Sequence, residues 1–203
     1  LFIVNNFKVK SFFPKINKDI KLLNHNLEIS YGKEGFNISG DGDFQLQNNI
    51  DKISYLIKSK NNKYNFSSSI YIKDNPFNIS FFNYEKNEKN ELIIDLKGKK
   101  KFDNKITFDS IAITEKTNKI NIEGLTFDKN FKITNLKKAK INLLDKENKK
   151  NQFYLSQKKN SYLLKGSSFN ANNLTQQLID AENDFNIINK NFKLDIDILK
   201  LVL

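Results

Sequence analysis

Few residues in this sequence have the types and spacing that catalysis or metal binding requires. His25 is the only histidine and there is no cysteine, so a Ser/His/Asp triad or a histidine-based metal site would depend on one imidazole. Asp41 and Asp43 stand between glycines, but the spaced acidic set and the closing Glu of a calcium loop are missing. Their spacing favours a turn rather than an ion site.

The remaining carboxylates also fail to suggest an active site. Asp95, Asp103 and Asp109 fall on polar faces or in turns, and no two of them converge on a cleft. The seven glycines are scattered and form neither a phosphate-binding loop nor a dinucleotide fingerprint. We therefore expect a protein that is not an enzyme and that uses no cofactor or metal.

Positive charge is concentrated in one part of the chain. The net charge is +11, and residues 129–165 contain eleven lysines against two acidic residues, Asp145 and Glu147. Arginine, which makes the bidentate contacts typical of nucleic-acid recognition, is absent, so we expect no nucleic-acid partner. Lysine point charges suffice to attract anionic lipid head groups, although solvated turns and an outward face are the favoured explanation for most of these lysines. The predicted basic patch consists of Lys137, Lys138, Lys140, Lys149 and Lys150.

A regular alternation of apolar and polar residues organises the middle of the chain. Seven such runs begin at Ile50, Lys63, Pro76, Glu91, Lys105, Asn118 and Phe131. Each run is about ten residues, roughly 33 Å of extended chain, and the intervening turns are short enough to force neighbouring runs to pair. The pattern predicts an antiparallel meander over residues 50–166.

The last three runs share a spacing of apolar residues that is two, then three, then two. In the first of them, Ile106 and Phe108 give way to Ile111 and Ile113. Because side chains alternate strictly along a strand, either each strand has a bulge or each exchanges its buried face midway. Both alternatives bend the sheet into a groove. The predicted concave apolar surface consists of Ile106, Phe108, Ile120, Ile122, Phe131 and Ile133.

The flanking segments complete a mainly β architecture. Residues 1–49 are expected to form N-terminal strands, and Ser167 and Ser168 suggest a cap for a short helix over residues 167–183 that buries Leu174 and Leu178. Alternation resumes over residues 190–203 as the start of a next sheet. The fold class expected is a long antiparallel meander that forms a curved open sheet or groove, with one short helix near the C-terminus. We expect residues 1–203 to be a fragment of one elongated β-groove.

Two segments near the C-terminus carry a family resemblance. Residues Lys165, Gly166, Ser167, Ser168, Phe169, Asn170 and Ala171 close a hairpin before the helix, and Lys193, Leu194, Asp195, Ile196 and Asp197 open the next strand. This arrangement resembles the AsmA-like superfamily, and in particular its YhdP-type large periplasmic proteins. Asn170 stands where the family pattern has an acidic residue.

The resemblance implies a role in lipid transport. A protein of this kind is anchored in the inner membrane of a Gram-negative bacterium, and its β-groove conducts phospholipid across the periplasm toward the outer membrane without enzymatic activity. The chain has no run of about 18 apolar residues, so the implied membrane anchor would lie outside this fragment. A structural or adhesive β-solenoid module and a fragment of a transmembrane β-barrel are alternative interpretations of the same alternation.

Overall fold

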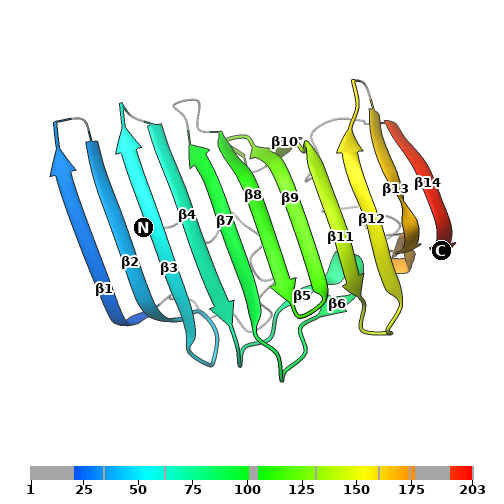
Figure 1. Cartoon of the computed structure of the whole chain (residues 1–203), viewed down its shortest axis with the longest axis horizontal. Coiled ribbons are helices and arrows are strands. Elements are labelled where there is room, and N and C mark those ends of the chain that lie inside the picture. Colours follow the sequence, from blue (N-terminus) through cyan, green and yellow to red (C-terminus); the bar gives the residue numbers. More distant parts are fainter. Residues whose placement is uncertain are drawn as a thin grey trace.

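The protein forms one large twisted sheet with a small two-stranded sheet beneath it (Figure 1). The computed structural model describes residues 21–33, 35–61, 63–100, 105–130, 132–159, 161–173, 175–176 and 193–202. In chain order the elements are β1 (Lys21–Gly32), β2 (Gly35–Gln45), β3 (Asp51–Lys60), β4 (Lys63–Ile72), β5 (Asn78–Ile79), the 3-10 helix η3 (Ser80–Phe82), β6 (Tyr84–Glu85), β7 (Leu92–Lys100), β8 (Ile106–Glu115), β9 (Asn118–Phe127), β10 (Ile133–Asn135), β11 (Lys138–Leu144), β12 (Lys150–Gln157), β13 (Ser161–Asn170) and β14 (Lys193–Val202).

The predicted mainly β fold is confirmed. Twelve strands form the large sheet in the order β1-β2-β3-β4-β7-β8-β9-β11-β12-β13-β14, with β10 paired to β9. All neighbouring pairs are antiparallel except β13 and β14. The sheet is open, and within the described residues β1 and β14 are its two edges.

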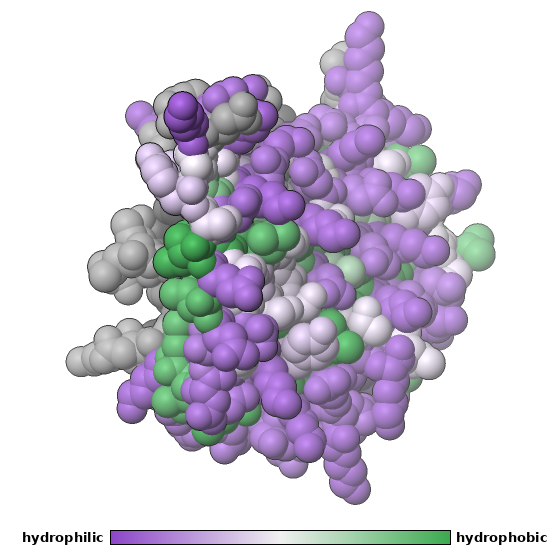
Figure 2. Space-filling view, turned by 60° about the vertical axis from the view of Figure 1, so that its left-hand side comes forward, coloured by the Kyte–Doolittle hydropathy of each residue, from purple (hydrophilic) through white to green (hydrophobic). Residues whose placement is uncertain are grey.

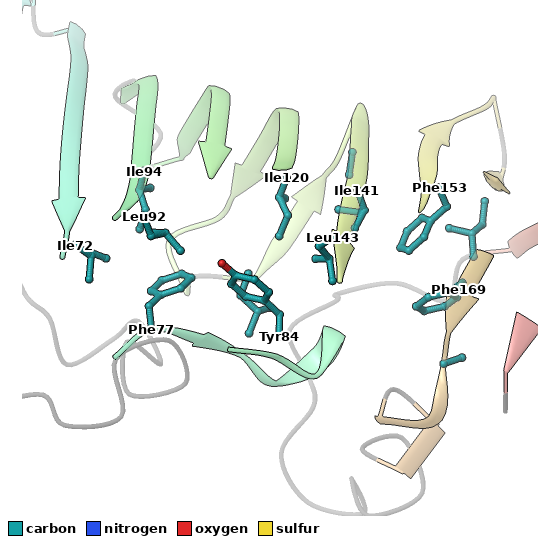
Figure 3. Close-up of a cluster of buried hydrophobic side chains, with 14 residues drawn as sticks. Ile72, Phe77, Tyr84, Leu92, Ile94, Ile120, Ile141, Leu143, Phe153 and Phe169 are labelled. Carbon is teal, nitrogen blue, oxygen red and sulfur yellow. The ribbon is translucent and has the colours of Figure 1, made fainter. Parts of the chain in front are cut away.

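The third predicted run, which begins at Pro76, is not a strand of the large sheet. Residues 73–91, here called the strap, leave the end of β4 and cross beneath the sheet as β5, η3 and β6 before β7 begins. Phe77 and Tyr84 on the strap meet Leu92, Ile120 and other side chains that point down from the sheet (Figure 3). The prediction failed because apolar alternation does not specify which partner an extended segment packs against.

Two C-terminal predictions also need correction. β13 continues to Asn170, so Ser167 and Ser168 lie in a strand and do not cap a helix; the helical residues described are 172, 173, 175 and 176, and Leu174 and Leu178 lie outside the described residues. β14 does not begin a new sheet, because it pairs in parallel with β13, from Ser161 opposite Lys193 to Asn170 opposite Val202. Residues 1–20 of the predicted N-terminal strands also lie outside the described residues.

Both glycines around Asp41 lie inside β2 and not in a turn. Gly40 and Gly42 face the point where the pairing of β1 with β2 shifts register. A Cβ on Gly40 would lie 2.6 Å from the ring of Tyr55, which stacks on His25 with ring centroids 5.6 Å apart. The glycines are required for this close ring packing.

Candidate functional site

One face of the large sheet is apolar along its whole width, and the strap divides it into two halves. Paired residues in adjacent strands place their side chains on the same face, so the register identifies this face strand by strand. In one half, the strap covers the face, and the side chains of Ile72, Leu92, Ile120 and Leu143 are 4% exposed or less. We call this region the covered half.

The other half of the apolar face lies toward the opposite end of the strands and is only partly buried. We call it the open half; it consists of Phe36, Ile38, Ile57, Tyr64, Phe66, Ile106, Phe108, Leu125, Phe127 and Ile133. Leu125 is buried, Tyr64 is 38% exposed, and the other eight are intermediate. These residues stand apart from the buried cluster beneath the strap.

Aromatic rings form a continuous stripe across the open half. Phe108 meets Phe66 edge-on with centroids 5.5 Å apart, and it meets Phe127 in the same manner at 6.1 Å. Gly98 lies beneath the first contact, since a Cβ there would come within 2.6 Å of the Phe66 ring. The sequence therefore provides a preformed apolar surface that spans four strands.

The five predicted groove residues that the structure describes share one face. In register, Ile106 pairs with Phe127, Phe127 with Ile133, and Ile111 with Ile122. Of the two sequence alternatives, the structure has the bulge. The register of β7 with β8 shifts between Lys97 and Gly98, where Asp109 has no partner, and the pairing of β8 with β9 omits both Asp109 and Gly124. Residues on both sides of the step therefore stay on the apolar face. Gly124 has φ +64°, which favours glycine.

The strap nevertheless separates these predicted residues. Ile106, Phe108 and Ile133 belong to the open half, whereas Ile120 is buried at 4% and Ile122 packs against the covered cluster. Phe131 lies outside the described residues. Phe66 was not predicted because it lies outside the last three runs, and Phe127 was not predicted because it follows the step of three in its run. Their position within a few residues of lysine-bearing turns was an available signal in the sequence.

A buried polar network fixes the strap to the sheet on one side. The Glu115 carboxylate accepts hydrogen bonds from the Tyr84 hydroxyl at 2.7 Å, the Asn87 backbone N–H at 2.9 Å, Asn90 Nδ2 at 2.9 Å and Asn118 Nδ2 at 3.3 Å. Burial alone would raise the pKa of Glu115, but these four donors lower it below its ordinary value. Burial and the Glu115 carboxylate raise the pKa of Tyr84. Glu115 therefore has a structural role.

A second network holds the start of the strap. Asn75 Nδ2 donates to Asp51 Oδ2 at 2.7 Å, and the Lys73 backbone N–H donates to Asp51 Oδ1 at 3.2 Å. Burial raises the pKa of Asp51 despite these bonds. Burial also lowers the pKa of Lys86, whose Nζ donates to the carbonyl oxygens of Lys73 and Asn87. These buried charged groups hold the backbone of the strap.

The five lysines of the predicted basic patch lie along β11, at the start of β12 and in the turns beside these strands. Lys138, Lys140 and Lys150 occupy positions that face away from the apolar side, as their register partners do. Lys137 packs beside Gly124, and Lys149 Nζ lies 2.7 Å from Glu147, whose hydrogen bond raises the pKa of Lys149. Lys138, Lys140 and Lys150 therefore share the face of the sheet opposite the apolar one.

The back face has a shallow hollow that is lined in part by Lys119, Lys140 and Lys165. Lys165 Nζ is paired with Asp197 at 2.7 Å, and this hydrogen bond raises its pKa. Tyr154 also lines the hollow. The hollow is open, and although lysines and amides contribute to it, most of its exposed lining is apolar.

The residues whose types could serve catalysis or metal binding lie apart from one another. His25 Nε2 is 3.1 Å from the Tyr55 hydroxyl, Asp95 accepts a hydrogen bond from Ser69, and Asp109 pairs with Lys99. Asp43 accepts a hydrogen bond from Asn24 Nδ2, and Asp103 lies outside the described residues. In the part of the chain that the structure describes, no group of three or more metal-ligating side chains is close enough to hold a metal ion.

Asn170, which departs from the family pattern, has a structural role. Its Nδ2 donates to Asp145 Oδ2 at 2.7 Å, and its backbone N–H donates to Asn151 Oδ1 at 2.8 Å. All three side chains are buried at one end of the sheet. An amide can donate this bond to Asp145, whereas a second ionised carboxylate would repel it.

Comparisons with protein-family models, curated proteins and solved structures found no match for this chain. Among the described residues, no helix has the length and apolar character needed to cross a membrane.

Proposed function

We propose that the open half of the apolar face binds the acyl chains of phospholipid, as a non-enzymatic β-groove segment. The single observation that carries this proposal is the aromatic stripe of Phe66, Phe108 and Phe127, which lies outside the covered cluster although it is contiguous with it on one face. Contiguous apolar surface of this kind marks a binding site for an apolar partner.

The wider setting follows from the resemblance to the AsmA-like superfamily. In this proposal the chain is part of a periplasmic protein anchored to the inner membrane of a Gram-negative bacterium, and the groove conducts phospholipid toward the outer membrane. The form of the sheet supports this setting, since the sheet that the described residues build is open and further strands could continue it at an edge.

The test pairs two substitutions on the same face. The 203-residue chain is purified, its lipid is extracted and quantified by mass spectrometry, and the melting temperature is measured on the same samples. Phe108→Asn, in the open half, should reduce lipid per protein with a small change in melting temperature, because a polar group would lie among acyl chains. Ile120→Asn, in the covered half, should lower the melting temperature strongly, because it buries an unsatisfied amide in the core.

Two outcomes would contradict the proposal. A stable wild-type chain that carries no lipid, and takes up none from vesicles, would show that the open half has another partner. A Phe108→Asn variant that keeps its full lipid content would show that lipid binds elsewhere.

A further inference from the structure

The two ends of the large sheet differ sharply in charge. At the end beside the open half, the described residues of the turns and of the strand ends that flank them are 33, 60–61, 63, 100, 105, 128–130, 132 and 158–159, and they contain nine lysines and one acidic residue. At the opposite end, the segments 46–51, 73–91, 115–117 and 145–149 contain six lysines and eight acidic residues. We call the first the lysine end and the second the mixed end.

This difference follows from the order of the strands. Each antiparallel pair reverses the chain, so alternate turns fall at the same end of the sheet, as the strand directions in Figure 1 show. The lysines are therefore far apart in the sequence and close together in the fold. The net charge of the chain does not reveal the concentration, because acidic residues at the mixed end offset part of it.

The acidic groups at the two ends also have different roles. At the mixed end, Asp51, Glu115 and Asp145 are buried and hold the strap and the turns. At the lysine end, Asp128 Oδ1 accepts the backbone N–H groups of Asn130 and Lys132. The carboxylate of Asp128 is thus engaged with its own turn.

The lysine end continues directly from the aromatic stripe. Lys100 is paired with Tyr64 on one side and with Ile106 on the other, so it lies between two residues of the open half on the same face, at the last position of β7. Lys63 and Lys129 are exposed at the neighbouring turns. Space-filling shows apolar side chains gathered in a band along one margin of the molecule, with hydrophilic side chains over most of the face in view (Figure 2). Apolar surface that ends in a row of cations matches the chemistry of an anionic lipid.

We infer that the lysine end selects the anionic head group of a lipid whose acyl chains lie on the open half. This inference rests on the proposed function and adds the head-group class and the orientation of the bound lipid. The lysine ammonium groups act as point charges toward the head-group phosphate and need no bidentate geometry, which suits a rim that contains no arginine. Zwitterionic lipids lack the net charge that this rim attracts.

The test compares two triple variants of equal charge. Lys63, Lys100 and Lys129 are changed to Gln at the lysine end, and Lys89, Lys116 and Lys146 are changed to Gln at the mixed end; all six are exposed. Each protein is incubated with vesicles of equimolar phosphatidylglycerol and phosphatidylcholine and reisolated. The ratio of the two lipids bound to the protein is then measured by mass spectrometry at low and high salt.

Wild type should carry phosphatidylglycerol in excess, and the excess should fall with salt. One lysine near an anionic lipid surface changes binding by about fivefold, so the lysine-end variant should lose up to about 100-fold of the enrichment, whereas the mixed-end variant keeps it. Equal loss in both variants, or no enrichment in wild type, would overturn the inference while lipid binding itself stands. Wild type that takes up neither lipid would overturn both the inference and the proposed function.

Discussion

Replacement of Glu115 by Gln tests whether the strap is held by a charged acceptor. The two carboxylate oxygens accept four hydrogen bonds, two at Oε1 from Asn87 and Asn90 and two at Oε2 from Tyr84 and Asn118. A Gln side chain retains one acceptor oxygen and turns an NH2 group toward the other two donors. At least two hydrogen bonds to a charged group are lost in a buried site, and each contributes about 1.5–3 kcal/mol. We expect Glu115→Gln to lower the free energy of unfolding by about 3 kcal/mol or more.

The assay is equilibrium urea unfolding followed by circular dichroism, with Glu88→Gln as the control because Glu88 is exposed on the same strap. The pH dependence gives a second readout. Because the donors lower the pKa of folded Glu115 below its ordinary value of 4.5, its contribution is present above that value and is lost as the pH falls through the folded pKa. Below pH 4.5, the free energy of unfolding should therefore fall less steeply with decreasing pH in Glu115→Gln than in wild type. A loss below about 1 kcal/mol, comparable to that of the control, would refute the reasoning.

Three further predictions concern packing, backbone and surface charge. Phe77→Ala should cost about 3–5 kcal/mol in urea unfolding, because Phe77 is 2% exposed and fills the space beneath the sheet; a smaller cost would mean that the strap closes over the gap. Gly124→Ala should lower the free energy of unfolding by about 1–2 kcal/mol in the same assay, since φ is +64° and the new Cβ would lie 2.8 Å from Lys137 Cβ. An unchanged free energy of unfolding would mean that the bulge is not at Gly124. Lys99→Gln should change stability by less than about 1 kcal/mol, because Lys99 and Asp109 are 40% and 52% exposed, and a larger loss would point to an unrecognised contact.

Most strands of the sheet could be predicted because their signal is local. Six of the seven predicted runs correspond to β3, β4, β7, β8, β9 and the β10–β11 segment, and the turns at Asn61 and Asn148 have the positive φ that Asn tolerates. The three-residue step in the apolar spacing of the last three runs also predicted a bulge, as one of two alternatives. These features depend on residues that are neighbours in the sequence.

The strap could not be predicted because its signal is not local. Residues 76–85 have the same alternation as a strand, yet Phe77 and Phe82 pack against side chains of the sheet and not beside a neighbouring strand. The contacts that settle its path join residues far apart, as when Asn83 donates to Glu147 at 3.2 Å. The division of the apolar face into two halves was missed for the same reason.

The position of β14 in the sheet could not be predicted either, for a different reason. Alternation over residues 193–202 predicted a strand correctly, but it carries no information on whether the strand joins the existing sheet or opens another. A parallel partner requires a long connection, and here residues 171–192 provide it. The candidate site was predictable in part, since Ile106, Phe108 and Ile133 were identified, whereas the concentration of lysines at one end depends on the full strand order.

The parallel pairing of β13 with β14 has a consequence for the order in which the sheet assembles. Antiparallel partners joined by a few residues meet early, because closing a short loop costs little chain entropy. β14 must return across 22 residues, 171–192, to reach β13. This connection is longer than residues 73–91, which join β4 to β7, and is the longest between adjacent strands of the described sheet; pairings that close long loops slow folding. β14 is therefore expected to dock last, on a ladder whose other strands are already in place.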